Sequence, residues 1–594
     1  MLHNLSLTFN EISINFDRKN KKDNLTIPKT IDIQTGKKIL IIGKSGSGKS
    51  IFLKCIAGLL DKKHVKLNGT ININNKSMEF SSYKNYKNIV KKIFGKHATM
   101  IHQDAINHLH PYRNIARQIG ECCFDKKNLQ KKIVEVCHQV GLVPLITNDK
   151  IEDDKFYYLL KSIKRSNLSG GMCQRVSLAS LLIQNPALIF MDEPFSDIDV
   201  SSRQTLKNLI IDRSLLKKNS CLLMATHDVD IIKNVDMFSK ILLVKNCEIS
   251  EVNKIPEEWY NCTLKAKNSI NSKLKDDIIL YSNNNIKYKY SNAMKYAVNM
   301  ERSNMSFKLK RNEHTGIVGE TGSGKSTLAR LIAYLIRDSS EIFITNINPN
   351  NKHILLRKLN NRQYKNIQVV FQDSLGTINR KETISSIIKR LQRKRYFDND
   401  LVYDNFEKIG LSFHTIDKFT IDELSMGMLR RFLLVKAFLG LYPINEQDEP
   451  KILILDELTR GLDPINRQKV FKYLSYLKGV TCVIISHDLD FIGKFCKRII
   501  VMYKGLIVEE KFASNNGDCA FPLKKWQHPY SKKLWNKEEI ELQPGIYNID
   551  SCNYYPYCIS RNIDKCLEKK NIIINRNSLN NGWYYCIKGN NNEN

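Results

Sequence analysis

The chain repeats one ordered set of motifs in its two halves, and this repeat limits its fold more than any other feature. Each half contains an apolar run before a glycine-rich turn, then an apolar run that ends in two acids, then one that ends in His-Asp. The three runs are KKILIIGKSGSGKS (37–50), ALIFMDEP (187–194) and CLLMATHD (221–228) in the first half, and HTGIVGETGSGKST (314–327), KILILDEL (451–458) and TCVIISHD (481–488) in the second. The sequence therefore predicts two similar domains in tandem.

Helical stretches separate these apolar runs, which are short enough to be buried strands. Strands that alternate with helices favour a parallel sheet covered by helices, an α/β fold. At 594 residues the chain is too long for one hydrophobic core, which agrees with two domains. We expect a first domain over 1–252, a polar linker over 253–278, a second domain over 279–515 and a small cysteine-containing C-terminal extension over 516–594.

Composition limits where such a chain works and what it binds. No run of about 18 or more apolar residues occurs, and the N-terminus lacks the apolar core of a signal peptide. We therefore expect a cytoplasmic chain whose membrane-spanning parts belong to partners. The net charge of +33 favours nucleic acid or an anionic membrane surface, but Lys, Asn and Ile are abundant throughout and the lysines form no dense block. Nucleic acid is therefore not expected as a partner.

Both glycine-rich turns fit the pattern G-x-x-x-x-G-K-[ST]. Glycines in such a loop let backbone N–H groups surround phosphate oxygens at the N-terminus of the following helix. Lys49 and Lys325 would reach the terminal phosphates, and Ser50 and Ser326 would hold Mg²⁺. The loop residues are Gly43, Lys44, Ser45, Gly46, Ser47, Gly48, Lys49 and Ser50 in the first half, and Gly319, Glu320, Thr321, Gly322, Ser323, Gly324, Lys325, Ser326 and Thr327 in the second.

The acid pairs supply the second part of this chemistry. Asp192 and Asp456, at the ends of their strands, would support Mg²⁺ through water. Glu193 and Glu457 are then placed to polarise the attacking water, because phosphoryl transfer depends mostly on positioning and charge stabilisation. Two acids that only cap the next helix are an alternative for one occurrence, but a poor one for two pairs in register.

LSGGMCQR (168–175) resembles the signature of ATP-binding-cassette (ABC) ATPases, and its GM-x-QR form is similar to the peptide and nickel importer branch. The segments 100–121 and 369–388 resemble that branch's Q-loop region, and RIIVMYKGLIVEE (498–510) resembles its closing strands. The resemblance covers nearly the whole chain, except the linker and the polar tips. It implies two ABC nucleotide-binding domains that bind and hydrolyse ATP with Mg²⁺.

The resemblance also assigns roles to single residues. It implies Q-loop glutamines that sense Mg²⁺, water and the membrane partner, switch histidines that contact the γ-phosphate, and aromatic residues that stack on adenine. A histidine after a strand, or an aromatic at a strand end, is also compatible with a purely structural role. The matching positions are Gln103 and Gln372 for the glutamines, His227 and His487 for the histidines, and Phe16 and Tyr290 for the aromatics.

In this family two modules pack head to tail, so that each ATP lies between one phosphate loop and the opposite signature. Here the pair would form within one chain, at high effective concentration. The signature residues implied at helix N-termini, where they would cap the γ-phosphate, are Ser169, Gly170 and Gly171 in the first domain and Ser425 and Gly427 in the second.

The two composite sites are not expected to be equivalent. The second signature has Met426 where the first glycine is expected, and Ile51 follows the Mg²⁺ serine where the family usually has a second hydroxyl. Head-to-tail pairing puts both departures in the same site. The other site, with Lys325 and the complete first signature, is intact. We therefore expect the intact site to hydrolyse ATP faster.

The C-terminal extension holds two further features. QHPYSKKL (527–534) resembles the HPY-containing extension of peptide and nickel importer ATPases, and EEWYNCTLKAK (257–267) stands at the comparable place after the first domain. The second feature is a set of four cysteines spaced C-x5-C-x7-C-x19-C, a spacing similar to the iron–sulfur motif of some members. A [4Fe–4S] cluster, zinc and four unconnected thiols all remain open. The four are Cys552, Cys558, Cys566 and Cys586.

The resemblance implies the energising subunit of a peptide-type importer at the cytoplasmic face of the inner membrane. Its partners would be two transmembrane permease subunits and an extracytoplasmic substrate-binding protein, with 104–167 and 373–423 gripping the permeases. A tandem ATPase that acts on ribosomes or nucleic acid is the alternative, favoured by the charge and opposed by the short linker. An inactive scaffold is disfavoured because both glutamates and both histidines are present. Dipeptide, oligopeptide, nickel and metal-chelate cargo all remain open.

Overall fold

The structure is a computed structural model, and it divides the chain into two compact units. The first contains Met1–Cys262, and the second contains Thr263–Arg460 and Asn466–Asn594. The residues that the structure describes are 6–18, 21–26, 31–34, 36–44, 47–59, 65–73, 76–80, 84, 87–88, 98–101, 108–143, 152–165, 168, 170–195, 220–232, 235–245, 248–256, 278–282, 286–289, 297–300, 307–320, 322–336, 342–345, 353–359, 361–371, 378–443, 449–459, 462–512, 526–536, 574–577 and 582–585.

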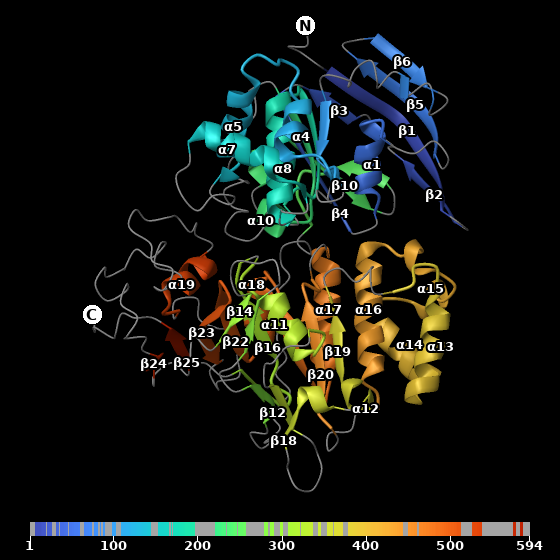
Figure 1. Cartoon of the computed structure of the whole chain (residues 1–594). Coiled ribbons are helices and arrows are strands. Elements are labelled where there is room, and N and C mark those ends of the chain that lie inside the picture. The colour runs from blue at the N-terminus through green and yellow to red at the C-terminus, as the bar shows by residue number, and fades with distance from the viewer. Residues whose placement is uncertain are drawn as a thin grey trace. The chain divides into compact units, whose positions relative to one another are not determined.

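The first unit contains one mixed sheet whose described strands run in the order β6-β5-β1-β2-β11-β10-β4-β9-β8-β7, with β3 paired to β1 (Figure 1). Its centre, β10-β4-β9-β8-β7, is parallel throughout. The strands are β1 (Ser6–Arg18), β2 (Lys21–Thr26), β3 (Ile31–Gln34), β4 (Lys38–Gly43), β5 (Val65–Ile73), β6 (Lys76–Phe80), β7 (Ala98–Ile101), β8 (Leu188–Asp192), β9 (Cys221–Ala225), β10 (Lys240–Lys245) and β11 (Glu248–Glu251).

In the first unit, α1 follows the glycine-rich turn, and α4, α5, α7 and α8 form a cluster of packed helices. Helix α1 begins directly after the first glycine-rich turn, and α8 packs against α4 and α5 (Figure 1). The helices are α1 (Lys49–Ile56), α4 (Ile115–Glu121), α5 (Leu129–Gln139), α7 (Asp153–Ser162), α8 (Gly170–Gln184) and α10 (Val229–Ile232), with the short 3-10 helix η3 (Val235–Met237).

The second unit repeats the parallel centre in the same order, β22-β16-β21-β20-β19. Antiparallel strands extend it from β22 through β23 and β25 to β24, and the sheets β15-β12-β17-β18 and β13-β14 are separate. The strands are β12 (Ile278–Ser282), β13 (Lys287–Tyr288), β14 (Val298–Asn299), β15 (Lys308–Lys310), β16 (Thr315–Val318), β17 (Ile342–Thr345), β18 (His353–Leu355), β19 (Ile367–Val370), β20 (Lys451–Asp456), β21 (Val480–Ile485), β22 (Arg498–Tyr503), β23 (Leu506–Phe512), β24 (Ile574–Asn577) and β25 (Gly582–Tyr585).

The helices of the second unit match those of the first at the motif positions, since α11 follows the glycine-rich turn and α16 begins in the signature (Figure 1). They are α11 (Lys325–Ile332), α12 (Asn361–Tyr364), α13 (Ile384–Arg395), α14 (Asn399–Lys408), α15 (Phe413–Ile416), α16 (Met426–Gly440), α17 (Pro464–Tyr476), α18 (Leu489–Phe495) and α19 (Pro529–Asn536), with 3-10 turns η6 (Leu356–Lys358) and η8 (Ile421–Glu423).

The inner parallel strands β4, β8, β9, β20 and β21 are buried along their whole length, as expected for strands covered by helices on both faces. Three single cysteines, Cys55 on α1, Cys137 on α5 and Cys482 on β21, are buried and serve as small core residues. Burial raises the pKa of the Cys137 and Cys482 thiols to about 12, so both stay protonated. None of the helices in the described ranges is long and apolar enough to cross a membrane.

Candidate active sites

The first glycine-rich turn connects β4 to α1 and has the geometry of a phosphate-binding loop. Gly48, just before α1, has φ 110°, a value that glycine adopts without strain. A side chain at Gly43 would meet the Val244 carbonyl at 2.6 Å, so only glycine fits there. Lys49 is buried, and its Nζ donates to the carbonyls of Gly43 at 2.7 Å and Lys44 at 3.1 Å. The lysine therefore lies along the inside of the loop, where phosphate oxygens would replace these carbonyls.

The second turn, between β16 and α11, repeats this arrangement. Gly319 and Gly324 have φ 150° and 98°, and a side chain at Gly319 would collide with the Met502 carbonyl. Lys325 is also buried, and its Nζ donates to the carbonyls of Gly319 at 2.8 Å and Glu320 at 2.7 Å. Both loops therefore have glycine where a side chain would collide with neighbouring backbone. This is the arrangement expected of a loop that surrounds the phosphates of a nucleotide.

The first acid of each pair lies beside the serine that ends its loop. Ser50 Oγ donates to Asp192 Oδ1 at 3.0 Å. Burial raises the pKa of Asp192 and of Asp456, and hydrogen bonds from Ser50 and Ser326 oppose the rise in each case. Mg²⁺ prefers a few carboxylate or hydroxyl oxygens together with substrate phosphates, so each Ser–Asp pair fits this ion.

The second acid of each pair has an unusual backbone conformation. Glu193 and Glu457 have φ 50° and 53°, in the left-handed region that costs a side chain of this size about 1–3 kcal/mol. Each donates its N–H at 2.9 Å to the carbonyl at the end of the neighbouring strand, that of Ala225 or Ile485. The turn that this conformation makes places both glutamates at the carboxyl edge of the parallel strands, where ligands of such sheets bind.

The histidines contact these glutamates, but not equally. His227 Nδ1 lies 2.6 Å from Glu193 Oε1, whereas His487 Nε2 lies 3.5 Å from Glu457 Oε1. In the first domain the Thr226 hydroxyl and the His227 N–H also donate to Glu193 Oε2, each at 3.3 Å. Burial would raise the pKa of Glu193, but attraction to His227, its hydrogen bonds and Lys49 hold that pKa below its usual value.

The aspartate after the second histidine has a role that the sequence pattern did not reveal. Asp488 is the N-cap of α18, and its carboxylate accepts from the Phe491 N–H at 3.1 Å. An N-cap aspartate satisfies a free N–H of the first helical turn and stabilises the helix start. The His-Asp motif therefore fixes where α18 begins, and with it the position of His487.

The signatures begin the long helices α8 and α16, as their proposed role requires. In the second domain Ser425 is the N-cap of α16 and its hydroxyl accepts from the Met428 N–H at 3.3 Å. Met426, in place of glycine, is 49% exposed, so its side chain is not needed for the core.

Sequence reasoning missed a residue in the second signature. Gln174 in the first signature donates to the Pro194 carbonyl at 2.6 Å. Arg430 takes its position in the second domain, close enough to Glu457 to attract it, and burial lowers the pKa of Arg430 to about 10. The substitution is visible when GMCQR is compared with GMLRR, but its importance depends on the fold.

Several predicted site residues cannot be placed. Phe16 lies on β1 opposite Asp23 of β2, and only its backbone is described. Within the described ranges no group of His, Cys, Asp or Glu could hold a metal ion by itself. Ser45, Gly46, Gln103, Ser169, Tyr290, Thr321 and Gln372, and the cysteines Cys552, Cys558, Cys566 and Cys586, lie outside the described residues.

Comparison with known proteins identifies the class to which these sites belong. The family profile described as "ABC transporter" matches residues 28–196 and 302–460, which are more than half of the chain. Each matched range contains one phosphate-binding loop and one acid pair. The chain therefore belongs to the ABC transporter family, and it is an ATPase with two ABC domains in tandem.

Individual relatives share this two-domain layout. The Peptidoglycan transport ATP-binding protein YejF of Agrobacterium fabrum is 26% identical over 546 residues, with 86% of this chain and 93% of the relative covered. The Uncharacterized ABC transporter ATP-binding protein YejF of Escherichia coli K12 is 25% identical over 570 residues, covering 89% and 98%. A solved structure of RNase-L Inhibitor, 17% identical, superposes with a TM-score of 0.51 over 82% of this chain and 87% of its own. That last likeness concerns the tandem fold alone.

Proposed function

We propose that this chain is the energy-coupling ATPase subunit of a membrane importer of the peptide and nickel branch, bound peripherally to the cytoplasmic face of the inner membrane. The observation that carries the proposal is the shared layout with a protein named for peptidoglycan transport, over 93% of that protein's length. The HPY sequence after the second domain supports the same branch through its resemblance to that branch's extension, and its histidine and tyrosine are buried parts of the fold. Two transmembrane permeases and an extracytoplasmic binding protein would complete the importer.

In this proposal two ATP molecules bind between the phosphate loop of one domain and the signature of the other. Lys49 and Lys325 contact the terminal phosphates, and Glu193 and Glu457 polarise the attacking water. The pairs Ser50–Asp192 and Ser326–Asp456 would hold Mg²⁺, which would supply positive charge beside the phosphates. His227 and His487, whose ring nitrogens lie 2.6 Å and 3.5 Å from the glutamates, contact the γ-phosphate. ATP binding joins the domains and hydrolysis releases them, which gives the permeases a two-state driving motion.

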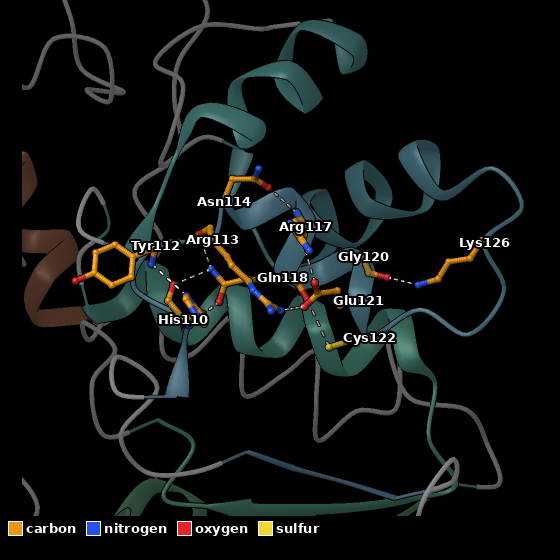
Figure 2. Close-up of polar contacts among 10 residues, drawn as sticks. All are labelled: His110, Tyr112, Arg113, Asn114, Arg117, Gln118, Gly120, Glu121, Cys122 and Lys126. Carbon is orange, nitrogen blue, oxygen red and sulfur yellow. Dashed lines mark hydrogen bonds and ion pairs between the residues drawn. The ribbon is translucent and has the colours of Figure 1, made fainter.

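A turn before α4 is suited to contact a permease. Figure 2 shows that the Gln118 side chain donates to the carbonyls of His110 and Arg113 and accepts from the His110 N–H, at 2.8–3.2 Å. Arg113 also forms an ion pair with Glu121 at 2.6 Å. The turn is therefore held in one conformation before any partner binds. It presents Tyr112, which is 78% exposed, and rigid exposed tyrosines are typical contacts at protein interfaces.

A cavity of about 330 Å³ lies close to this turn, among α4, α5 and α7. Its lining includes the apolar Ala116, Leu129 and Ile133 and the cations Lys126 and Lys161, together with Arg117, which is ion-paired with Glu121 at 3.0 Å. An amphipathic permease helix could place an apolar side chain in it and acidic groups at its rim. This cavity and the Tyr112 turn both fall in 104–167, the segment predicted to grip the permeases.

Affinity purification of the tagged full-length chain from detergent-solubilised membranes tests the proposal. Two integral membrane subunits should copurify, and Tyr112→Ala should lower their recovery by about 10-fold or more, the effect of removing an interface hot spot. Tyr476→Ala is the matched control, because Tyr476 is an exposed tyrosine too, at 50%, but lies on α17, outside the proposed contact segments. Both variants should bind ATP normally. Copurification of no membrane subunit would contradict the importer.

The competing function is a tandem ATPase that acts on ribosomes or nucleic acid, and the net charge of +33 favours it. Binding of that kind weakens steeply with salt, because it depends on counterion release. Ribosomes or nucleic acid that copurify at low salt and are lost at high salt, without permeases, would establish this alternative.

The four C-terminal cysteines are proposed to hold a [4Fe–4S] cluster, with zinc as the alternative. Protein purified without oxygen should then contain iron and sulfide in equal amounts and show a visible absorption shoulder. Cys558→Ser should remove both, and zinc without iron would identify the other ligand.

A further inference from the structure

The start of α19 packs directly against the second phosphate-binding loop. Tyr530, in the first turn of α19, is fully buried, and its hydroxyl accepts the backbone N–H of Glu320 at 2.8 Å. Its ring packs on Tyr503 at the end of β22, with 4.5 Å between the ring centroids. A residue of the C-terminal extension therefore reaches a backbone group of the loop itself.

The Gly319–Glu320 peptide that Tyr530 contacts is held at both of its ends. Its N–H donates to Tyr530, and its carbonyl, that of Gly319, accepts from Lys325 Nζ at 2.8 Å. A trans peptide is planar, so its N–H and C=O point in opposite directions, and fixing one direction fixes the other. Gly319 has φ 150° and no side chain to restrict this rotation. The Tyr530 hydroxyl therefore restricts the group that orients Lys325.

The extension is anchored independently of this contact. The N–H groups of Gln527 and His528 donate to the Glu509 carboxylate on β23 at 2.9 Å and 3.1 Å. The rings of Trp526 and Trp535 stack with centroids 4.0 Å apart, which closes the segment on itself. Tyr530 is thus held by a rigid support, and its hydroxyl can position the loop rather than follow it.

We propose that Tyr530 is a positioning residue of the second ATP site and that the C-terminal extension takes part in nucleotide binding through it. The proposal rests on the assignment of Lys325 to the terminal phosphates. Residues 526–536 would then help to bind nucleotide at the second site. This role is separate from their resemblance to the extension of one branch of the family.

The test uses the full-length chain with Lys49→Ala, so that nucleotide binding reports the second loop. In this background Tyr530→Phe removes only the hydroxyl. It should raise the Kd for MgATP and MgADP about 3- to 10-fold, the range for one lost hydrogen bond. Tyr473→Phe is the matched control, because Tyr473 is equally buried and its hydroxyl donates to Asn405 at 2.7 Å, away from the loop. Both variants should lose similar stability, and only Tyr530→Phe should change Kd.

With both loops intact, Tyr530→Phe should raise KM for ATP at the second site while kcat at saturation stays within about twofold, because the reacting groups are unchanged. In the unsubstituted chain, MgATP should slow amide hydrogen exchange in 526–536, a readout that needs no variant.

Two results distinguish the possible failures. Equal Kd values for Tyr530→Phe and Tyr473→Phe, with no ATP-dependent exchange in 526–536, would overturn the role of Tyr530. Lys325→Ala should abolish binding in the Lys49→Ala background. If it does not, the assigned phosphate contact is wrong, and the proposed ATP site fails with it.

Discussion

Replacing Glu457 with Gln should remove most of the ATPase activity, whereas replacing Glu193 should remove little. Met426 and Ile51 already favour this asymmetry, since both would belong to the composite site of the first phosphate loop. The structure adds a second reason in the side chain of Glu193. Its Oε1 lies 2.6 Å from His227, and its Oε2 accepts from Thr226 and His227. These contacts use three of the about four acceptor positions of the carboxylate and hold the pKa of Glu193 below its usual value, which weakens it as a base for the attacking water.

The size of the asymmetry follows from the contact between Glu193 and His227. A hydrogen bond to a charged group contributes about 1.5–3 kcal/mol, and about 1.4 kcal/mol changes a rate tenfold. Breaking this contact would slow the site by about 10- to 150-fold. Glu457 lies 3.5 Å from His487, beyond the usual range of a strong hydrogen bond, so its contact with the histidine is weaker.

Steady-state ATPase rates of the full-length chain measure this difference. Glu457→Gln should retain less than about one-tenth of the activity, and Glu193→Gln about nine-tenths, because the loss of a general base costs about 100-fold or more at its own site. Glu248→Gln, on the exposed face of β11, is a control that should change nothing. ATP binding should persist in all three variants. Equal losses at Glu193 and Glu457, or a larger loss at Glu193, would refute the reasoning.

Three further predictions concern residues of the second unit. Met426→Gly should raise the residual ATPase of Glu457→Gln several-fold, since it restores the signature at a half-exposed position; no rise would show that the methionine is not limiting. Arg430→Gln removes a cation that favours ionised Glu457, so the acid limb of the pH–rate profile should move to higher pH; an unmoved limb would contradict this role. Burial lowers the pKa of His528 to about 3 and of His314 to about 4. The unfolded chain therefore binds more protons below pH 6.5, and acidification to pH 5.5 should cost about 1.4 kcal/mol per histidine. Urea midpoints at pH 7.5 and 5.5 measure this loss, which His528→Gln should reduce by about half.

The sequence predicted those parts of the sites that short motifs specify, in the order in which they occur along the chain. Apolar strands, glycine-rich turns and acid pairs in the same order twice predicted the tandem α/β fold, which the structure and the family profile confirm. The domain boundaries, the adenine contacts and the C-terminal cysteines stay predictions.

Contacts between distant residues could not be predicted in this way. Tyr530 and Glu320 are 210 positions apart, and no periodicity relates a helix start in the extension to a loop amide. Arg430 is visible as a departure from the first signature, but only the packing of α16 brings it near Glu457. The same two residue types, 34 positions apart in the first domain and 30 in the second, gave distances of 2.6 Å and 3.5 Å, because side-chain distances depend on tertiary packing.

The structural difference between the two sites lies in the contacts of their side chains, because the backbone around the two glutamates is the same. Glu193 and Glu457 have φ values of 50° and 53°, and their N–H groups donate to equivalent strand carbonyls at the same distance of 2.9 Å. A strained conformation kept at both positions means that both turns are built to present a glutamate to the loop. What differs is what each glutamate contacts, namely a close histidine and threonine in one domain and a nearby arginine in the other. Exchanging Gln174 and Arg430 should therefore change the relative rates of the two sites without changing either fold.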